Sequence, residues 1–254
     1  MAFYNELDLL SASPIVIPDV CTVHPIFLFE FKGKGASERY MEYRQCLSLI
    51  SMTADDTIQA FKKAGIDPSQ FGSSLSQFEL LMIIPIFREL LIGSLSYFIE
   101  EKVMWDNTRL ALICQDNNGD YVGEISSDTY PLVRRVILES NYIEVEKDAS
   151  ELKFSNSKAK SIFEKLRAGK QRKASASRSS APSISDMISA VCIRSNGYTL
   201  FNIWDLSIYQ LYDQFSRLHA NFEVDLVGLK WAAYGTEPFD TALWYKNFKE
   251  EKDV

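Results

Sequence analysis

This chain has few histidines and no closely spaced cysteines, which limits the metal sites that it could form. There are only two histidines, His24 and His219, and they lie far apart in the sequence. None of the cysteines belongs to a Cys-x-x-Cys pair; they are Cys21, Cys46, Cys114 and Cys192. A structural zinc site needs several such ligands at short spacing. The sequence therefore predicts no metal, no cofactor and reduced thiols.

Motifs of nucleotide binding and catalysis are also missing. Around Lys34 the chain lacks both the preceding glycine and the following Ser or Thr of a phosphate-binding loop. The acidic stretch Asp116–Asp120 has Tyr121 where a calcium-binding loop needs glycine. No G-x-S-x-G or G-x-G-x-x-G pattern occurs. We therefore expect a protein that is not an enzyme.

The chain lacks an apolar run that is free of charge. Its one membrane candidate, Leu80 to Ile99, is interrupted by Pro85 and carries Arg88 and Glu89 at its centre. Each central charge costs roughly 2.5–3.5 kcal/mol in a bilayer, so the sequence predicts a buried core helix and no membrane span. The segment Met1–Asp8 has acids, Glu6 and Asp8, where a signal peptide has basic residues. We expect a cytoplasmic protein.

What the chain does have is the composition of a globular protein. Its 254 residues are 46% hydrophobic and 24% charged, which fits one or two folded domains. The net charge of −7 argues against broad nucleic-acid binding by the folded body.

The secondary-structure pattern predicts an α+β fold that is mainly α. Residues 14–31 are expected to be extended, Asn118-Gly119 marks a β-hairpin, and a short strand is expected at 142–145. Helices are predicted at 37–51, 55–64, 76 onward, 129–140, 157–166, 185–194 and 202–222.

Helix-terminal residues refine these boundaries. Ser37 and Asn202 are the predicted N-caps of their helices, and Ser76 with Glu79 matches a capping box. Gly65 and Gly235 are the expected helix stops.

A composition change divides the chain into three parts. Residues 168–183 contain no aromatic and no large aliphatic side chain, so burial cannot offset the entropy of ordering them. We predict an N-terminal α+β domain at 1–166, a basic flexible linker at 167–183 and a small helical module at 184–254. The linker is either a solvated tether or an electrostatic contact to nucleic acid or to an acidic partner. In the second case the contacting residues are Lys170, Arg172, Lys173 and Arg178.

Aromatic side chains are concentrated in the last part of the chain. Such rings bury large areas with little loss of rotamer entropy, so they form a core of their own or bind a partner. We expect part of this set to be a protein-binding surface. The candidate residues are Trp204, Tyr209, Tyr212, Phe215, Trp231 and Trp244.

Two stretches of the sequence resemble those of a known protein family. They are Asn202–Phe215, with the pattern W-D-x-x-x-Y-Q-x-x-D, and the Trp-Tyr-Lys-Asn at 244–247. They resemble proteins of the tail-morphogenesis region of tailed bacteriophages that are grouped as tail assembly chaperones. The resemblance covers the chain from near Ile184 onward. It implies a non-enzymatic protein of the infected host cytoplasm that binds tail tube or tape-measure subunits.

Alternatives remain open at this point. The chain is also compatible with a minor structural component of the virion, at its neck or tail. A third alternative is a phage nucleic-acid-associated protein that acts through the basic linker. Self-association into a homo-oligomer is compatible with all three alternatives.

Overall fold

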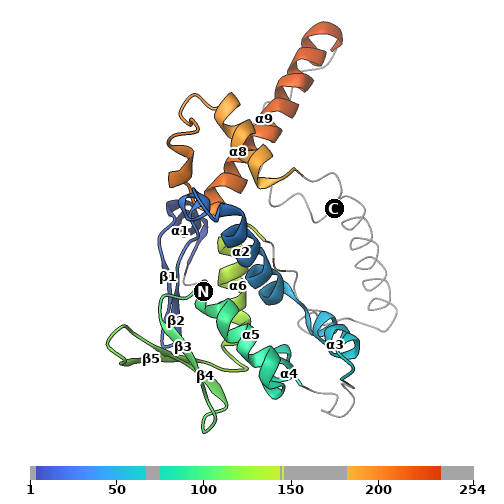
Figure 1. Cartoon of the computed structure of the whole chain (residues 1–254). Helices are drawn as coiled ribbons and strands as arrows, with labels where there is room; N and C mark the ends of the chain where they lie inside the picture. Colours follow the sequence, from blue (N-terminus) through green and yellow to red (C-terminus); the bar gives the residue numbers. More distant parts are fainter. Residues whose placement is uncertain (1–3, 67–74, 144, 146–181, 236–254) are drawn as a thin grey trace. The chain divides into compact units, whose positions relative to one another are not determined.

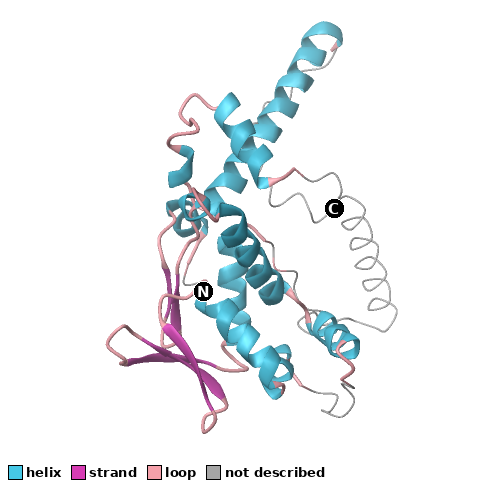
Figure 2. Cartoon of the chain, in the orientation of Figure 1, coloured by secondary structure: helices cyan, strands magenta, loops and turns pink. Residues whose placement is uncertain are grey.

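The structure, a computed structural model, describes residues 4–66, 75–143, 145 and 182–235 (Figure 1). These residues form two compact units. The first contains the described residues up to 145 together with Trp204–Gln210, and the second contains 182–203 and 211–235. Helix predominates over strand, which confirms the predicted α+β, mainly α class (Figure 2). None of the helices described is long and apolar enough to cross a membrane.

The described residues up to 145 contain six α-helices. They are α1 (Glu6–Ser11), α2 (Ala36–Ser51), α3 (Ala54–Lys63), α4 (Gln77–Ile83), α5 (Pro85–Ser96) and α6 (Tyr130–Ser140), with a 3-10 helix η1 at Leu28–Phe31. The second unit contains α8 (Ile184–Arg194). Helix α9 (Ile208–Tyr234) begins in the first unit, after the 3-10 turn η3 (Ile203–Asp205), and continues into the second.

Two small antiparallel sheets accompany these helices. The first is the hairpin of β1 (Ile15–Ile17) and β2 (Cys21–Val23), and the second has the order β3 (Lys102–Asp106), β4 (Ala111–Gln115), β5 (Tyr121–Ile125). Cys114 of β4 is paired with Gly123 of β5. A Cβ atom at Gly123 would overlap the carbonyl group of Asp19 in the β1–β2 turn, so the two sheets meet at a position that only glycine fits.

The core of the first unit combines helix and strand residues. Side chains that expose no surface at all include Leu28, Ile50, Phe61, Leu81, Leu91, Phe98, Leu112, Ile125 and Ile137. Tyr43 of α2 donates from its hydroxyl to Asn141 Oδ1 at 3.0 Å, and Asn141 Nδ2 donates to the Ile137 carbonyl at 2.7 Å. This buried chain of hydrogen bonds fixes α2 against the end of α6.

Helix ends confirm some predictions and correct others. Ser76 and Glu79 form the predicted capping box, and Gly65 adopts the left-handed φ of +76° expected after α3. Ser37 is not the cap of α2, because the helix begins one residue earlier and Gly35 (φ +76°) occupies the N-cap position. Asn202 is not the cap of α9 either, since its side chain accepts from the Thr199 amide in a turn.

The apolar run at 80–99 was predicted as one buried helix, and that prediction is wrong. Ile84 is extended between α4 and α5, and Pro85 occupies the first turn of α5, where its missing N–H costs nothing. Ile86 and Leu90 on α5 are 66% and 52% exposed. Only part of the run, including Leu81, Leu91 and Leu95, lies in the core.

Two local predictions about extended segments are also corrected, and one strand was missed. The expected strand at 142–145 does not form at its described residues, because Tyr142 has φ +60° and its amide closes α6 on Glu139. Residues 28–31, expected to be extended, form the 3-10 helix η1, and strand β3 was not predicted. The predicted helix 157–166 lies outside the described residues, as does the linker up to residue 181.

Candidate partner-binding surface

The segment Trp204–Gln210 carries much of the residue pattern noted above, and it belongs to the first unit. Ser207 is paired with Phe27 as an antiparallel β-bridge. The Leu28 amide donates to the Leu206 carbonyl at 2.9 Å, and the Ile208 amide donates to the Ile26 carbonyl at 2.8 Å. This segment is part of the predicted C-terminal module, but its main-chain hydrogen bonds join it to Ile26 and Leu28.

A capping box starts α9 directly after this bridge. Gln210 accepts from the Ser207 amide at 2.9 Å, and Ser207 Oγ accepts from the Gln210 amide at 3.1 Å. The Gln210 side-chain amide also donates to the Leu10 carbonyl at 2.7 Å. The pattern Ser-x-x-Gln is a known capping-box sequence, so this start was readable from the chain. Gln210 therefore fixes both the beginning of α9 and its contact with the end of α1.

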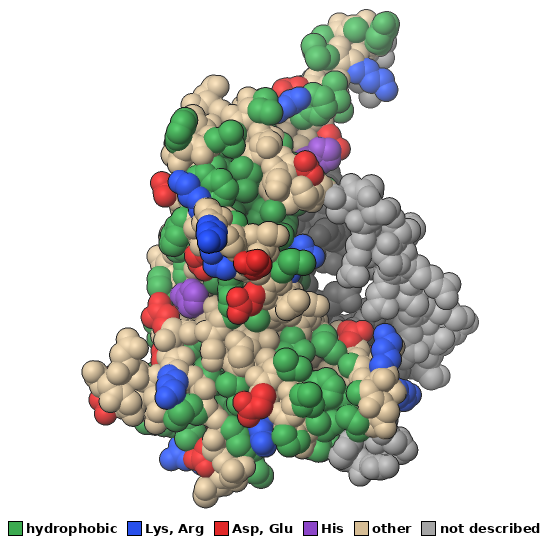
Figure 3. Space-filling view, viewed as in Figure 1, with side chains coloured by type: hydrophobic (Ala, Val, Ile, Leu, Met, Phe, Trp, Pro, Cys, Tyr) green, Lys and Arg blue, Asp and Glu red, His purple; other side chains and the backbone are tan. Residues whose placement is uncertain are grey.

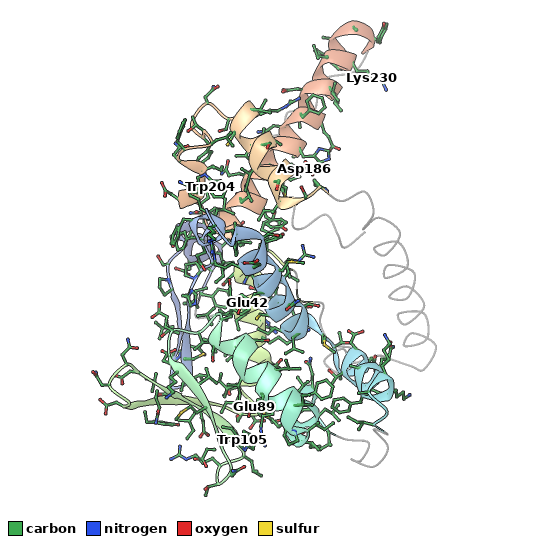
Figure 4. The ribbon with its side chains drawn as sticks, viewed as in Figure 1. Glu42, Glu89, Trp105, Asp186, Trp204 and Lys230 are labelled. Atoms are coloured by element: carbon green, nitrogen blue, oxygen red, sulfur yellow. The ribbon has the colours of Figure 1, made fainter. Side chains whose placement is uncertain are left out.

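Two of the predicted binding aromatics lie in this segment. Tyr209 is 2% exposed and its ring meets that of Tyr142 edge-on, with centroids 5.3 Å apart. Trp204 is half-buried, and Lys32 Nζ lies 5.8 Å from the centre of its ring (Figure 4). These contacts place both rings in the packing of the first unit, and their role toward a partner remains a prediction.

The other predicted aromatics have different surroundings. Tyr212 and Phe215 are half-buried on α9, and Trp231 near the end of that helix is 43% exposed. Trp244 lies outside the described residues, and so do Lys170, Arg172, Lys173 and Arg178 of the candidate nucleic-acid contact. The structure thus brings the described candidates onto one helix and its leading turn, without collecting them into a single patch.

Exposed apolar side chains are frequent in the second unit. Phe201, in the loop before α9, is 91% exposed, and Tyr234 at the end of α9 is 86% exposed. Ile193 at the end of α8 is 82% exposed. Soluble proteins expose single apolar side chains routinely, whereas several that gather on one surface are typical of a site that binds another molecule.

The outer half of α9 carries a stripe that the sequence analysis missed. Phe222, Leu226 and Leu229 are 40%, 49% and 69% exposed, and Figure 3 shows hydrophobic side chains on this end of the helix. The predicted seam ended at Phe222, although the spacing of three and four residues continues to Leu226, Leu229 and Ala233. This continued spacing was the feature of the sequence from which the stripe beyond Phe222 could have been predicted.

Charged groups on α9 are paired along the helix. Arg217 Nε lies 2.8 Å from the buried carboxylate of Asp213, and His219 Nε2 lies 3.4 Å from Glu223 Oε1. The Arg194 guanidinium, at the end of α8, lies 4.5 Å from the centre of the Phe222 ring. This last contact ties the end of α8 to the middle of α9.

Thiols and carboxylates form no metal cluster within the part of the chain that the structure describes. Cys21 and Cys114 are buried, and their mutual hydrogen bond, together with burial, raises the pKa of the Cys21 thiol far above its usual range. Arg134 donates to the carbonyls of Ile50, Ser51 and Met52 and so caps α2.

Comparison with known proteins adds one finding. Residues 170–249 match the family model described as the YomV second domain, a phage-derived family. This match is consistent with a phage protein, and it covers the second unit and the start of α9. No curated protein matches the chain, and no solved structure matches it.

Proposed function

We propose that this chain is a non-catalytic phage morphogenesis protein, and specifically a tail assembly chaperone that binds tail tube or tape-measure subunits in the host cytoplasm. The observation that carries the proposal is the exposure of large apolar side chains in the second unit. Phe201 and Tyr234 are 91% and 86% exposed, and this unit lies within the region that matches the phage-derived family.

A tail assembly chaperone would protect the assembly surface of a tail subunit until that subunit is assembled. Tail subunits have apolar assembly surfaces, and a chaperone must cover such surfaces with apolar side chains of its own. Aromatic side chains suit this task because they bury a large area and have few rotatable bonds. The scarcity of histidine and the missing catalytic motifs in the sequence favour a binding protein over an enzyme.

The test is co-expression of the full chain with the tail tube or tape-measure subunit of the same phage. We expect the chain to increase the soluble fraction of that subunit and to be recovered with it. The double variant Phe201→Asp with Tyr234→Asp should abolish both effects, because a charge at each exposed ring prevents apolar contact.

The matched control is Met41→Glu with Ile86→Glu, which adds two acids at positions 60% and 66% exposed in the first unit. This control should behave like the wild type. Unchanged subunit solubility with the wild-type chain would refute the chaperone role. Presence of the chain in purified mature particles would instead identify a virion component.

A further inference from the structure

The apolar stripe of α9 stays on one face of the helix but changes from buried to exposed along it. Its first part, the inner seam, consists of Leu211, Phe215 and Leu218, and Leu211 exposes no surface. Leu229 follows Leu211 by 18 residues, which is about five turns of helix, so both side chains lie on the same face. The face that is buried at the start of α9 is therefore exposed at its outer end.

The outer seam consists of Phe222, Leu226, Leu229 and Ala233, with steps of four, three and four. All four side chains are exposed, whereas the inner seam is buried or half-buried. The outer seam has the spacing of the core positions of a coiled coil. A second helix that carries the same spacing would fit it.

Charges beside the outer seam identify which helix fits. Glu223 and Lys230 are seven residues apart, so they flank the seam on the same side (Figure 4 labels Lys230). When two copies of this helix run antiparallel with Leu226 of one opposite Leu229 of the other, Phe222 faces the small Ala233. In the same register Glu223 of each copy faces Lys230 of the other.

The opposite flank is compatible with this register. Asp225 and Ala232 occupy it at the equivalent spacing, so the negative charge of Asp225 faces a neutral residue of the second copy. A parallel pair in register would instead place Asp225 beside Lys230 of the other copy, so it has as many attractive charge pairs as the antiparallel one. It would also put Phe222 opposite Phe222 and Ala233 opposite Ala233, whereas the antiparallel register puts each large ring opposite a small side chain. This match of large with small side chains favours the antiparallel arrangement.

From these observations we infer that the chain forms a two-fold dimer through antiparallel pairing of the outer halves of α9. Apolar contacts come from Phe222, Leu226, Leu229 and Ala233, and two Glu223–Lys230 pairs set the register. The paired segment is short, about 18 Å of helix at a rise of about 1.5 Å per residue. The dimer is therefore weak and depends on concentration. The inference does not depend on the proposed function.

The experiment is sedimentation velocity on the full chain over a range of concentrations, at low salt. We expect reversible dimerisation of the wild type. Leu226→Glu with Leu229→Glu should give a monomer, and the control Met41→Glu with Ile86→Glu should dimerise normally. A wild type that stays monomeric at every concentration overturns the inference, and would leave the stripe to another segment of the same chain or to another protein.

Charge reversal tests the register without disturbing the fold, because Glu223 and Lys230 are exposed. Glu223→Lys and Lys230→Glu should each weaken the homodimer by about tenfold, since both pairs become repulsive. An equimolar mixture of the two variants should restore wild-type affinity, because every pair in the mixed dimer is again attractive. Asp225→Lys, on the other flank, should change little. A mixture no tighter than either variant alone overturns the antiparallel register.

Discussion

The side-chain amide of Gln210 donates a hydrogen bond of 2.7 Å to the main-chain carbonyl of Leu10, two hundred positions earlier in the chain. The same side chain accepts from the Ser207 amide at the start of α9. One residue thus joins the helix start to the N-terminal segment.

Gln210→Ala should loosen this junction. It removes two hydrogen bonds at a mostly buried site, each worth about 1 kcal/mol, so local opening should become easier by roughly 1–2 kcal/mol. Hydrogen exchange of the Leu28 and Ile208 amides, which bond across the bridge, measures the effect directly. Gln214→Ala removes the same side-chain amide one turn later and should leave those two amides protected. Equal protection in both variants would contradict the role given to Gln210.

Arg134→Met should destabilise the first unit. The guanidinium donates to the carbonyls of Ile50, Ser51 and Met52 at 2.8, 3.1 and 3.3 Å, and these carbonyls have no helical partner beyond the end of α2. Hydrogen bonds from a charged donor are worth about 1.5–3 kcal/mol, and we expect a loss within that range in urea unfolding. Arg135→Met, at the exposed neighbouring position, serves as the control. A comparable loss in that control would refute the capping argument.

Much of the first unit could be predicted because the decisive signals are local. The Ser76–Glu79 capping box, the Gly65 stop and the Asn118-Gly119 hairpin each depend on a few adjacent residues, and all three are present. The break at Pro85 was missed because the apolar residues on both sides of the proline were assigned to one helix, although a proline is equally compatible with a new helix start.

Contacts between distant residues could not be predicted in this way. Nothing in the local pattern of Ile26–Leu28 or of Leu206–Ile208 indicates that these segments pair with each other. For the candidate surface, the aromatic content drew attention to Tyr209, which is buried, whereas the aliphatic Leu226 and Leu229 are exposed and were not among the predicted binding residues. Exposure depends on which seam another element covers, and a single sequence does not contain that information.

Two buried tyrosines should respond in opposite ways to loss of their hydroxyl groups. Tyr130 Oη has no hydrogen-bond partner among the described residues, and burial raises the pKa of Tyr130 to about 12. Tyr43 Oη donates to Asn141 at 3.0 Å in the core. We expect Tyr130→Phe to be neutral or stabilising and Tyr43→Phe to cost about 1–3 kcal/mol. Urea unfolding of both variants makes the comparison, and a clear loss in Tyr130→Phe would indicate a buried water that satisfies its hydroxyl.

Thiol modification should separate the cysteines by burial. Cys21 and Cys114 are buried, whereas Cys46 and Cys192 are half-buried. Alkylation requires the thiolate, and burial raises the pKa of Cys46 and of Cys192, so both should react at pH 8 more slowly than free cysteine. Mass spectrometry after iodoacetamide treatment should find Cys192 and Cys46 modified first. Early labelling of Cys21 in the native chain would contradict the packing between the two sheets.

Glycine-to-alanine substitutions at two positions should have opposite signs. At Gly123 a Cβ atom would overlap the carbonyl of Asp19, so Gly123→Ala must push the β1–β2 turn away from β5. Backbone on both sides leaves little room to adjust, and we expect a loss of about 1–3 kcal/mol. At Gly93, within α5, a Cβ atom meets nothing within 4 Å, and Gly93→Ala should stabilise the helix by about 0.5–1 kcal/mol. Thermal unfolding of the two variants gives the signs directly, and a tolerated alanine at Gly123 would show that the two sheets are not in contact there.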